Sequence, residues 1–249
     1  MRGEDQPMPK TAAVIIIGNE ILSGKVKDEN SHFLAVELRG LGVRLTRVEV
    51  VPDAVGDIAA SVASCAGRCD YVFTSGGIGP THDDVTMKGV ATAFGLDTVV
   101  NEHYRQVIIE RCGPRVSSVA LRMAELPRGA EVIELNGINF PPVRVKNVYV
   151  LPGVPEFLRK KFHALKERFR GNPYHLRSVY LNDEECLIAE TLDTVAGKFP
   201  MVEIGSYPKV GEKGWRIMVT LESGSEEALE EATTELLRLL PRETVIRTV

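Results

Sequence analysis

Runs of apolar residues predict several strands in the first two thirds of the chain. Thr11–Ile17 is β-branched and almost continuously apolar, which is typical of a central strand covered on both faces. Val43–Val51 alternates like a half-buried strand, and Tyr71–Thr74 is a short apolar run. Two later strands are predicted over Val132–Leu135 and Val143–Leu151, on either side of a proline-marked stretch.

Segments with apolar residues at helical spacing lie between these strands. Helices are predicted over Asp28–Leu38, Asp84–Phe94, Glu102–Arg111 and Phe157–Phe169, and a further helix is opened by Pro52-Asp53. The apolar face of the helix after Pro52-Asp53 carries Ile58, Ala59, Val62, Ala63 and Ala66. In Glu102–Arg111 we expect Val107, Ile108 and Cys112 to face inward. This alternation predicts an α/β domain in which helices cover both faces of a parallel sheet. Right-handed crossovers then bring the carboxyl ends of the strands to one edge, where such folds bind their ligands.

The pattern changes near Asn172-Pro173. Four strands and two helices follow in the order βαββαβ, over Ser178–Leu181, Glu184–Ala196, Met201–Tyr207, Trp215–Leu221, Glu226–Leu240 and Thr244–Arg247. This is the order of the ferredoxin-like α+β fold, and we expect Trp215 to pack between its strands and helices. The expected parts are a disordered N-terminus over residues 1–10, an α/β domain over 11–172 and a small α+β domain over 173–249.

The composition is that of an ordinary globular protein of 249 residues, of which 44% are hydrophobic and 26% charged. A net charge of -4 argues against a broad basic face for nucleic acid or anionic lipid. No apolar run approaches the roughly 20 residues of a membrane helix, and no leader precedes a cleavage site, so we expect a cytoplasmic protein. The cysteines form no CxxC pair, which argues against a zinc ribbon or a thioredoxin-type dithiol.

The densest candidate for chemistry is the segment Thr74–Asp84, which lies between a predicted strand and a predicted helix. Gly76, Gly77 and Gly79 allow the backbone to approach a ligand and to turn N–H groups toward it, and the following helix N-terminus favours an anion. A phosphate is the ligand that suits these groups. The spacing matches neither the dinucleotide fingerprint nor the Walker loop, and a purely structural tight turn is the alternative interpretation.

Two adjacent acids, Asp83 and Asp84, close this segment. Carboxylates directly beside a phosphate repel it unless a divalent cation bridges the two, which is how Mg²⁺-type ions enter phosphoryl sites. Capping of the next helix is the alternative role for these acids. We expect both roles, with one acid capping and the other binding metal.

Two further strand-end segments bring similar residues to the same edge. Gly18–Gly24 contains Glu20, and Asp28–Asn30 adds two acids and an amide. Leu151–Glu156 places glycine and proline where a helix begins. If the first and third strands are neighbours, these acids lie near the glycine-rich segment. Three loops then form one shared cleft.

These residues resemble those of a known family. Ser75–Thr86, Gly18–Gly24 and Leu151–Pro155 look like the motifs of the molybdopterin-binding-like domain of the competence-damage-inducible protein A (CinA) family. Asn139–Glu156 and Gly205–Pro208 are similar to the N-terminal domain of eukaryotic-type FAD synthase. The resemblance covers nearly the whole chain. It implies a MogA/MoaB-like three-layer α/β fold followed by a small α+β domain.

The resemblance also implies an activity. Members of the family hydrolyse the pyrophosphate of ADP-ribose or FAD with a divalent metal, while cousins adenylylate molybdopterin. Neither the deamidase domain of full-length CinA nor the adenylyltransferase domain of FAD synthase follows here, so we expect no synthesis of FAD. The segment Asn136–Asn139 replaces a longer loop of small residues, which bears on the identity of the substrate.

The leading hypothesis is a metal-dependent nucleotide pyrophosphatase for a dinucleotide or nucleotide sugar such as FAD or ADP-ribose. The alternatives are a molybdopterin adenylyltransferase-like protein with a molybdopterin-like ligand, and a non-catalytic nucleotide- or pterin-binding protein. A divalent metal (Mg, Mn or Co) is expected at Asp83, Asp84 and Glu20. The expected catalytic residues are Asp83, Asp84, Glu20 and Asp28. The expected phosphate- or nucleotide-binding residues are Ser75, Gly76, Gly77, Ile78, Gly79, Thr81, Gly18, Asn30, Pro152, Gly153, Pro155 and Lys209.

Relatives of this kind are typically oligomeric, so the resemblance suggests a homodimer or a higher homo-oligomer. In such an assembly Lys209, at the predicted hairpin tip Pro208–Gly214, would approach the anionic ligand of a partner and supply positive charge. A solvated hairpin loop is the alternative interpretation of this tip.

Overall fold

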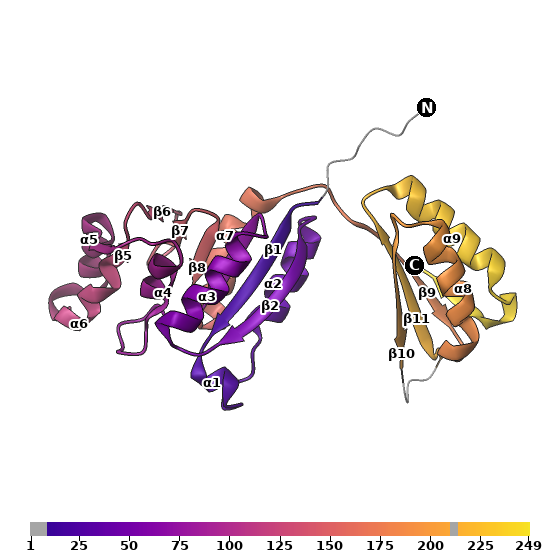
Figure 1. Cartoon of the computed structure of the whole chain (residues 1–249), viewed down its shortest axis with the longest axis horizontal. Coiled ribbons are helices and arrows are strands. Elements are labelled where there is room, and N and C mark those ends of the chain that lie inside the picture. The colour runs from indigo at the N-terminus through magenta and orange to yellow at the C-terminus, as the bar shows by residue number, and fades with distance from the viewer. Residues whose placement is uncertain (1–8, 210–213) are drawn as a thin grey trace. The chain divides into compact units, whose positions relative to one another are not determined.

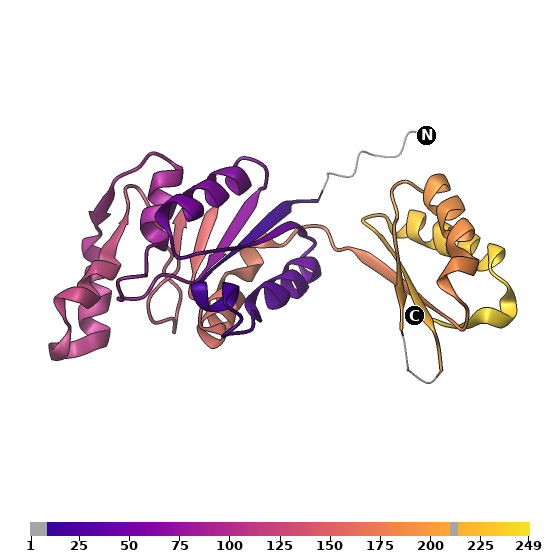
Figure 2. The same cartoon turned by 60° about the horizontal axis from the view of Figure 1, so that its bottom comes forward.

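The chain divides between Gly171 and Asn172 into two compact units, each of which places helices against a sheet (Figures 1 and 2). The structure, a computed structural model, describes residues 9–209 and 214–249. Residues 1–8 and the tip residues Val210–Lys213 of the predicted hairpin lie outside the described residues. No helix in the described ranges is long and apolar enough to cross a membrane.

The described part of the N-terminal unit contains a six-stranded sheet and a separate pair of strands. The sheet has the order β2-β1-β3-β8-β7-β6, with β1 (Thr11–Ile17), β2 (Arg44–Val51), β3 (Tyr71–Ser75), β6 (Glu131–Val132), β7 (Val143–Val145) and β8 (Val148–Leu151). The first four strands of this order run parallel to one another. β7 pairs antiparallel with β8, and β6 pairs antiparallel with β7. The pair consists of β4 (Thr98–Val100) and β5 (Glu125–Pro127).

Helices cover both faces of this sheet, with α2 (Asn30–Gly40) and α7 (Pro155–Leu165) on one face and α3 (Val55–Ala66) and α4 (Thr86–Ala93) on the other. The unit also contains α1 (Asn19–Leu22), α5 (Glu102–Cys112) and α6 (Ser118–Leu121), with 3₁₀ turns η1 (Gly113–Arg115), η2 (Arg122–Ala124) and η3 (Lys166–Phe169). Along β1, Val14 belongs to the buried cluster that contains Leu34 and Phe162, whereas Ile15 belongs to the one that contains Ile58. Successive side chains of a strand point to opposite faces, so β1 is covered on both. The predicted α/β architecture is confirmed.

One predicted strand is wrong, because Val143–Leu151 is a hairpin of two antiparallel strands. Val145 of β7 lies opposite Val148 of β8, and Lys146 and Asn147 form the turn between them. Lys146 has a φ of 53°, in the left-handed region. The Asn147 side chain donates hydrogen bonds to the carbonyls of Ala66 (3.1 Å) and Cys69 (2.9 Å). A turn of two polar residues interrupts the apolar pattern too briefly to be noticed in the sequence.

Two predicted helix faces are also corrected. On α3, Ala63 is exposed, and Cys65 is buried in its place beside Ile58 and Val62. On α5, Cys112 is exposed and the buried pair is Tyr104 and Ile108. Small residues such as Ala, Ser and Cys gain little from burial, so the packing of larger neighbours decides which of them face inward.

Lys10 lies within the N-terminal segment that was expected to be disordered, yet it is held at the start of the sheet. Its ammonium group lies 2.6 Å from Asp70 Oδ1, and its carbonyl accepts a hydrogen bond from the Arg44 N–H (2.8 Å). Asp70 Oδ2 also accepts from the Thr11 N–H (2.9 Å). These bonds hold the pKa of Asp70 below its ordinary value, the side-chain hydrogen bond from Lys10 being the main cause.

The C-terminal unit has the strand order β10-β11-β9-β12, with every pair antiparallel. Its elements are β9 (His175–Leu181), α8 (Glu185–Lys198), β10 (Glu203–Pro208), β11 (Ile217–Ser223), α9 (Glu226–Leu239), η4 (Arg242–Thr244) and β12 (Val245–Thr248). The predicted ferredoxin-like order is confirmed. The expected position of Trp215 between the strands and the helices is wrong. Its ring contacts the Tyr180 ring edge-on at 5.0 Å between centroids, and Tyr180 points to the opposite sheet face from its neighbour Val179, which lies in the core. Trp215 therefore lies on the sheet face opposite the helices.

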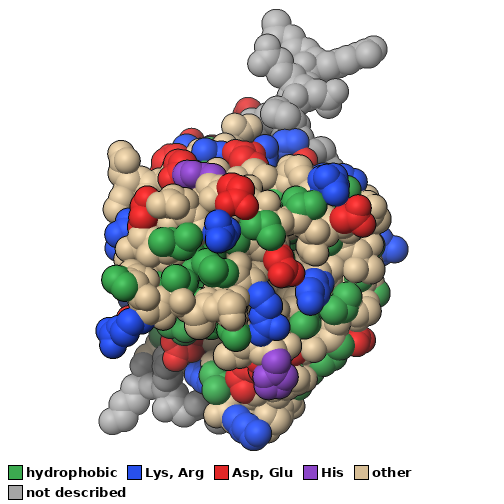
Figure 3. All heavy atoms as spheres, turned by 90° about the vertical axis from the view of Figure 1, so that its left-hand side faces the viewer, with side chains coloured by type: hydrophobic (Ala, Val, Ile, Leu, Met, Phe, Trp, Pro, Cys, Tyr) green, Lys and Arg blue, Asp and Glu red, His purple; other side chains and the backbone are tan. Residues whose placement is uncertain are grey.

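Figure 3 shows the face of the N-terminal unit that carries α5 and α6. Acidic and basic side chains are interspersed on it, with hydrophobic side chains between them. Opposite charges therefore lie near one another on this face, and no large area of a single charge sign is seen.

Candidate functional site

A cavity of about 700 Å³ is built around the loops that follow β1, β3 and β8. The described lining residues are Glu20, Val26, Gly76, Gly77, Ile78, Gly79, Asp84, Tyr104, Met123, Ile138, Asn139, Phe140, Pro152, Gly153, Val154, Pro155, Phe157, Lys160 and Lys161. This is the edge at which open parallel sheets bind ligands. Of the residues proposed from the sequence, it brings together Glu20, Gly76, Gly77, Ile78, Gly79, Asp84, Pro152, Gly153 and Pro155.

The glycines after β3 are required by the backbone. Gly76 and Gly77 have φ values of 111° and 62°, which other residues rarely adopt. A Cβ at Gly76 would overlap the Ile17 carbonyl oxygen, and one at Gly77 would overlap Thr86 Oγ1. The Gly76 carbonyl accepts a hydrogen bond from Thr86 Oγ1 (2.9 Å), and the Gly77 carbonyl accepts one from the Thr86 N–H (3.0 Å). The turn is therefore locked between β1 and α4.

The same turn leaves backbone donors available at the cavity. Within residues 9–209 and 214–249, the N–H groups of Gly77, Ile78 and Gly79 find no acceptor, and all three residues line the cavity. Successive backbone N–H groups in such a turn form a concave site that suits an anion. The structural and the phosphate-binding interpretations of this loop are thus compatible.

Two carboxylates line the cavity, and each lies against a glycine. A methyl group at Gly18 would come within 2.5 Å of Glu20 Oε1, and one at Gly79 within 2.7 Å of Asp84 Oδ2. Asp84 Oδ2 accepts hydrogen bonds from the Thr81 N–H (2.8 Å) and lies 2.6 Å from Thr81 Oγ1. Gly18 itself is absent from the lining.

Asp83, Thr81 and His82 lie outside the lining of the cavity. Thr81 Oγ1 is 2.6 Å from Asp83 Oδ1 as well as from Asp84, and its single proton can serve one of them at a time. This hydrogen bond is the main reason that the pKa of Asp83 is lowered. Neither acid caps α4, because the N-cap residue is Val85 and has no side-chain cap bond. The expected capping role is therefore wrong.

Asp28, Asn30 and Ser75 hold the loops together without lining the cavity. Asp28 Oδ1 accepts from the Asn30 N–H (2.9 Å) at the start of α2. Asn30 Nδ2 donates to Ser75 Oγ (3.0 Å) and to the Gly153 carbonyl (2.7 Å), and Ser75 Oγ donates to the Pro152 carbonyl (3.2 Å). Asn30 and Ser75 therefore hold neighbouring loops in position, and Asp28 accepts a hydrogen bond where α2 begins.

Lys209 belongs to the C-terminal unit, whereas the described lining residues of the cavity lie between residues 20 and 161. Its ammonium group lies 4.8 Å from the centroid of the Trp215 ring, and its N–H donates to the Arg216 carbonyl (2.8 Å). Its role at a partner's ligand stays a prediction.

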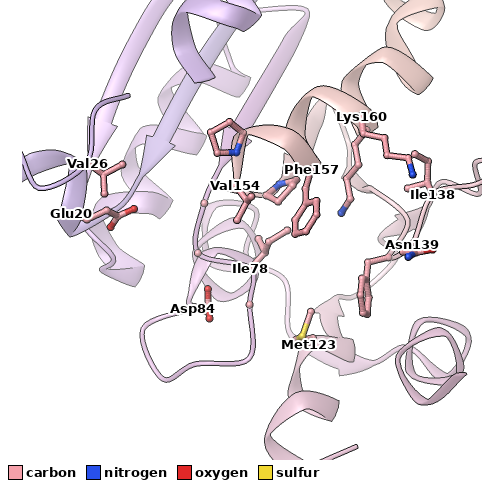
Figure 4. Close-up of a pocket in the computed structure, with 18 of the residues that line it drawn as sticks. Glu20, Val26, Ile78, Asp84, Met123, Ile138, Asn139, Val154, Phe157 and Lys160 are labelled. Atoms are coloured by element: carbon pink, nitrogen blue, oxygen red, sulfur yellow. The ribbon is translucent and has the colours of Figure 1, made fainter. Parts of the chain in front are cut away.

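The other end of the cavity was not foreseen from the sequence. It is apolar and aromatic, with Met123, Ile138, Phe140, Val154 and Phe157 among its lining residues. Figure 4 shows Glu20 and Asp84 on one side, Lys160, Ile138 and Asn139 on the other, and Ile78, Val154 and Phe157 between them. Phe157 gives a signal in the sequence, since it is a large apolar residue at a helix start, and it is 58% exposed. Ile138 and Asn139 belong to the segment Asn136–Asn139, which was expected from the sequence to bear on the identity of the substrate.

Phe140 is held in a strained conformation at this end. Its φ of 56° is in the left-handed region, which costs a bulky side chain about 1–2 kcal/mol. The ring packs against the buried cluster that contains Tyr104 and Ile108. Such strain persists only where the surroundings determine the conformation, and it is common at ligand sites.

Two polar side chains are buried among these apolar residues. Lys161 is 6% exposed and Tyr104 is 3% exposed, and both line the cavity. Burial lowers the pKa of Lys161 to about 8 and raises that of Tyr104 to about 12. Lys161 could have been suspected from the sequence, because Leu158, Phe162 and Leu165 mark the inward face of α7.

The donor set suits a divalent cation that is shared with a phosphate. In the described residues, no three His, Cys, Asp or Glu side chains are grouped as a metal site, so the expected set of Asp83, Asp84 and Glu20 is not assembled. Glu20 and Asp84 remain as carboxylates in the cavity. Mg²⁺ at phosphoryl sites is commonly bound by one or two carboxylates, substrate phosphate oxygens and water. Glu20 and Asp84 are donors of the kind that such an ion takes.

Comparisons with known proteins give a separate family match for each unit. Residues 13–171 match the family described as "Probable molybdopterin binding domain", and residues 173–249 match "FAD synthase, middle domain". A "Probable FAD synthase" of Caenorhabditis elegans is 34% identical over 94% of this chain and 50% of its own length. A CinA-like protein of Thermotoga maritima is 31% identical over 92% of this chain and 58% of its own. The chain thus spans about half the length of these curated relatives.

Two further similarities cover whole relatives. A protein of Archaeoglobus fulgidus is 33% identical over 91% of this chain and 96% of its own length. The crystal structure of CinA from Thermoplasma acidophilum matches with a TM-score of 0.60 at 31% identity, covering 65% of this chain and 98% of that one. An α/β domain with helices against its sheet, followed by a small α+β domain, is as expected. The chain therefore belongs to the molybdopterin-binding-domain family that includes the CinA-like proteins, and it continues into a FAD synthase middle domain.

Proposed function

We propose that the N-terminal unit is a metal-dependent nucleotide pyrophosphatase acting on a dinucleotide or nucleotide sugar such as FAD or ADP-ribose. The observation that carries this proposal is one cavity that combines the unpaired N–H groups of Gly77, Ile78 and Gly79 with the carboxylates of Glu20 and Asp84. The similarity to a protein named "Probable FAD synthase" supports a nucleotide as the ligand.

Different groups of the chain have different roles in this proposal. The three N–H groups bind oxygens of one phosphate, since a backbone turn of this kind is already organised for an anion. Thr81 holds the Asp84 carboxylate in place through its N–H and hydroxyl. The described lining residues include no serine, threonine or cysteine, and the proposal takes water as the nucleophile.

A divalent cation at Glu20 and Asp84, when bound, would neutralise phosphate charge and lower the pKa of the attacking water. Cavity volume is consistent with a substrate of dinucleotide size, because ligand cavities span roughly 300–1,000 Å³.

The test is AMP release from FAD, ADP-ribose and NAD by the purified full chain with Mg²⁺, Mn²⁺ or Co²⁺. Asp84→Asn and Glu20→Gln are expected to lower kcat/KM at least 100-fold, because each removes a charge that the cation needs. Asp83→Asn is the matched variant, since it removes the same charge one residue away and outside the lining. It is expected to lose less than tenfold.

Two outcomes would contradict the proposal. One is an absence of AMP release from all three substrates with each metal. The other is wild-type turnover by both Asp84→Asn and Glu20→Gln at saturating metal. A loss in Asp83→Asn as large as that in Asp84→Asn would favour the adjacent acid pair as the metal site.

A pterin-binding or molybdopterin adenylyltransferase-like protein is the second candidate. It is favoured by the family description of residues 13–171 and by the aromatic end of the cavity. ATP-dependent adenylylation of molybdopterin would support this activity, and pterin binding without turnover would support a non-catalytic binding protein.

A further inference from the structure

Lys161 is a buried cation whose charge no neighbouring residue balances. Within residues 9–209 and 214–249 its ammonium group makes no hydrogen bond or ion pair. The residue is 6% exposed, and because Nζ is not among the fully enclosed unpartnered polar atoms, its tip reaches the cavity that the residue lines. It lies six residues after Pro155, about 9 Å along the axis of α7. Burying an unpaired charge is costly, so a side chain in this state suits a partner that arrives with the ligand.

Tyr104 is a second hydrogen-bond donor that lines the cavity without a partner among the described residues. It is 3% exposed and lines the same cavity, and its hydroxyl group has no partner among the described residues. Because burial raises the pKa of Tyr104 to about 12, the hydroxyl keeps its proton near neutral pH. Buried tyrosine hydroxyls normally find a hydrogen-bond partner.

The surroundings limit what this partner can be. Met123, Ile138, Phe140 and Phe157 give this end apolar and aromatic walls, which suit the faces of a flat ring. The glycine-rich turn already offers three N–H donors for phosphate, which leaves the Lys161 and Tyr104 donors for another part of the ligand.

We propose that Lys161 and Tyr104 donate hydrogen bonds to carbonyl oxygens of a flat heteroaromatic ring of the flavin class, and so select it against adenine. This inference rests on the proposed function and names the ring that occupies the apolar end. A carbonyl-bearing ring presents acceptor oxygens to both donors, whereas the acceptor nitrogens N1 and N7 of adenine each adjoin its exocyclic amino group, a donor that opposes a second donor placed beside them.

The test measures ring binding without turnover. Riboflavin is titrated by quenching of its fluorescence, and adenosine by calorimetry, against the full chain. The wild type is expected to bind riboflavin at least tenfold more tightly than adenosine. Lys161→Met is expected to weaken riboflavin at least tenfold, the equivalent of one charge-assisted hydrogen bond, and to change adenosine less than twofold. Tyr104→Phe is expected to weaken riboflavin about fivefold.

Lys166→Met is the matched control. It removes the same charge on the turn that follows α7, where Lys166 faces Glu37 at 3.6 Å and lies outside the cavity. Its affinities for both rings are expected to stay within twofold of the wild type. Thermal unfolding of Lys161→Met checks that the variant is folded, which is expected since a buried charge is removed.

Three results would overturn the inference. They are equal or tighter binding of adenosine by the wild type, undetectable riboflavin binding at 1 mM, and an Lys161→Met variant that binds riboflavin as well as the wild type does. Each is a binding result and is independent of AMP release. Failure of the proposed function, by contrast, is a wild type that binds ligand and releases no AMP.

Discussion

The two ends of the cavity are built by different means. The glycine-rich end comes from consecutive residues after β3 and from the tips of two other strand-end loops. The apolar end collects Tyr104, Met123, Phe140 and Phe157 from segments that are far apart in the sequence. The first end is fixed by the sheet, and the second by helices and loops that pack beside it. The glycine-rich end can therefore be recognised as a motif, whereas the apolar end arises only from assembly.

The sheet-built end is expected to be the more fragile of the two. Gly76→Ala would place a methyl group on the Ile17 carbonyl oxygen in a backbone with a φ of 111°. Overpacking and backbone strain together predict a loss of about 3–5 kcal/mol in the free energy of unfolding. Urea denaturation measures this loss directly.

Gly24→Ala is the matched variant for Gly76→Ala. Gly24 also has a positive φ, of 71°, but nothing lies within 4 Å of the position where its Cβ would be. A loss of about 1 kcal/mol is expected from the backbone alone. Equal losses in the two variants would show that contact with β1 does not set the fragility of this end.

At the apolar end, removal of a side chain is expected to stabilise the protein. The pKa of Lys161 is about 8 in the folded chain, against an ordinary value of 10.5, because burial disfavours the charged form. A difference of this size corresponds to a penalty of about 3 kcal/mol at pH 7. Lys161→Met should therefore raise the free energy of unfolding by up to about this amount in urea denaturation at pH 7.

The sign with pH follows from proton linkage. Between pH 8 and pH 10.5 the unfolded chain binds more protons at Lys161 than the folded chain, so wild-type stability rises with pH. The penalty is complete below this window and absent above it. The advantage of Lys161→Met is thus expected to shrink as the pH rises through the window. A pH-independent advantage would mean that packing alone, and not charge, distinguishes the two proteins.

The smallest expected effect separates the ring of Phe140 from its backbone. Phe140→Ala and Phe140→Gly both remove the ring, but glycine relieves the strain of a φ of 56°. The glycine variant should be more stable than the alanine variant by about 1 kcal/mol. Thermal unfolding of the two variants measures this difference, and a more stable alanine variant would show that the loop relaxes once the ring is gone.

The fold was largely predictable because it rests on periodicity. β1 has the predicted bounds, and the βαββαβ order of the C-terminal unit was read from alternating patterns. The hairpin at Lys146 and Asn147 was missed because its two-residue turn carries no glycine or proline. The pair of β4 and β5 was missed because each strand has three residues.

The site was predictable only where it is local. The glycines and Asp84 were identified from one segment, but Asp83, its neighbour in sequence, lies outside the cavity lining. Sequence adjacency does not tell which of two successive side chains faces a ligand. Tyr104 and Phe140 carry no local signal, because their contribution depends on how α5 and the 136–142 loop pack against the sheet.

The amide of Asn30 bears on how the walls of the cavity can separate. It donates to Ser75 Oγ at 3.0 Å and to the Gly153 carbonyl at 2.7 Å, so it bridges the loops that follow β3 and β8. Ser75 Oγ donates to the Pro152 carbonyl (3.2 Å) and the Gly76 N–H to the Leu151 carbonyl (3.2 Å), so the two segments are joined at several points. Separation of the two walls of the cavity would therefore require these bonds to break together, and loosening of Asn30 alone would leave the walls connected.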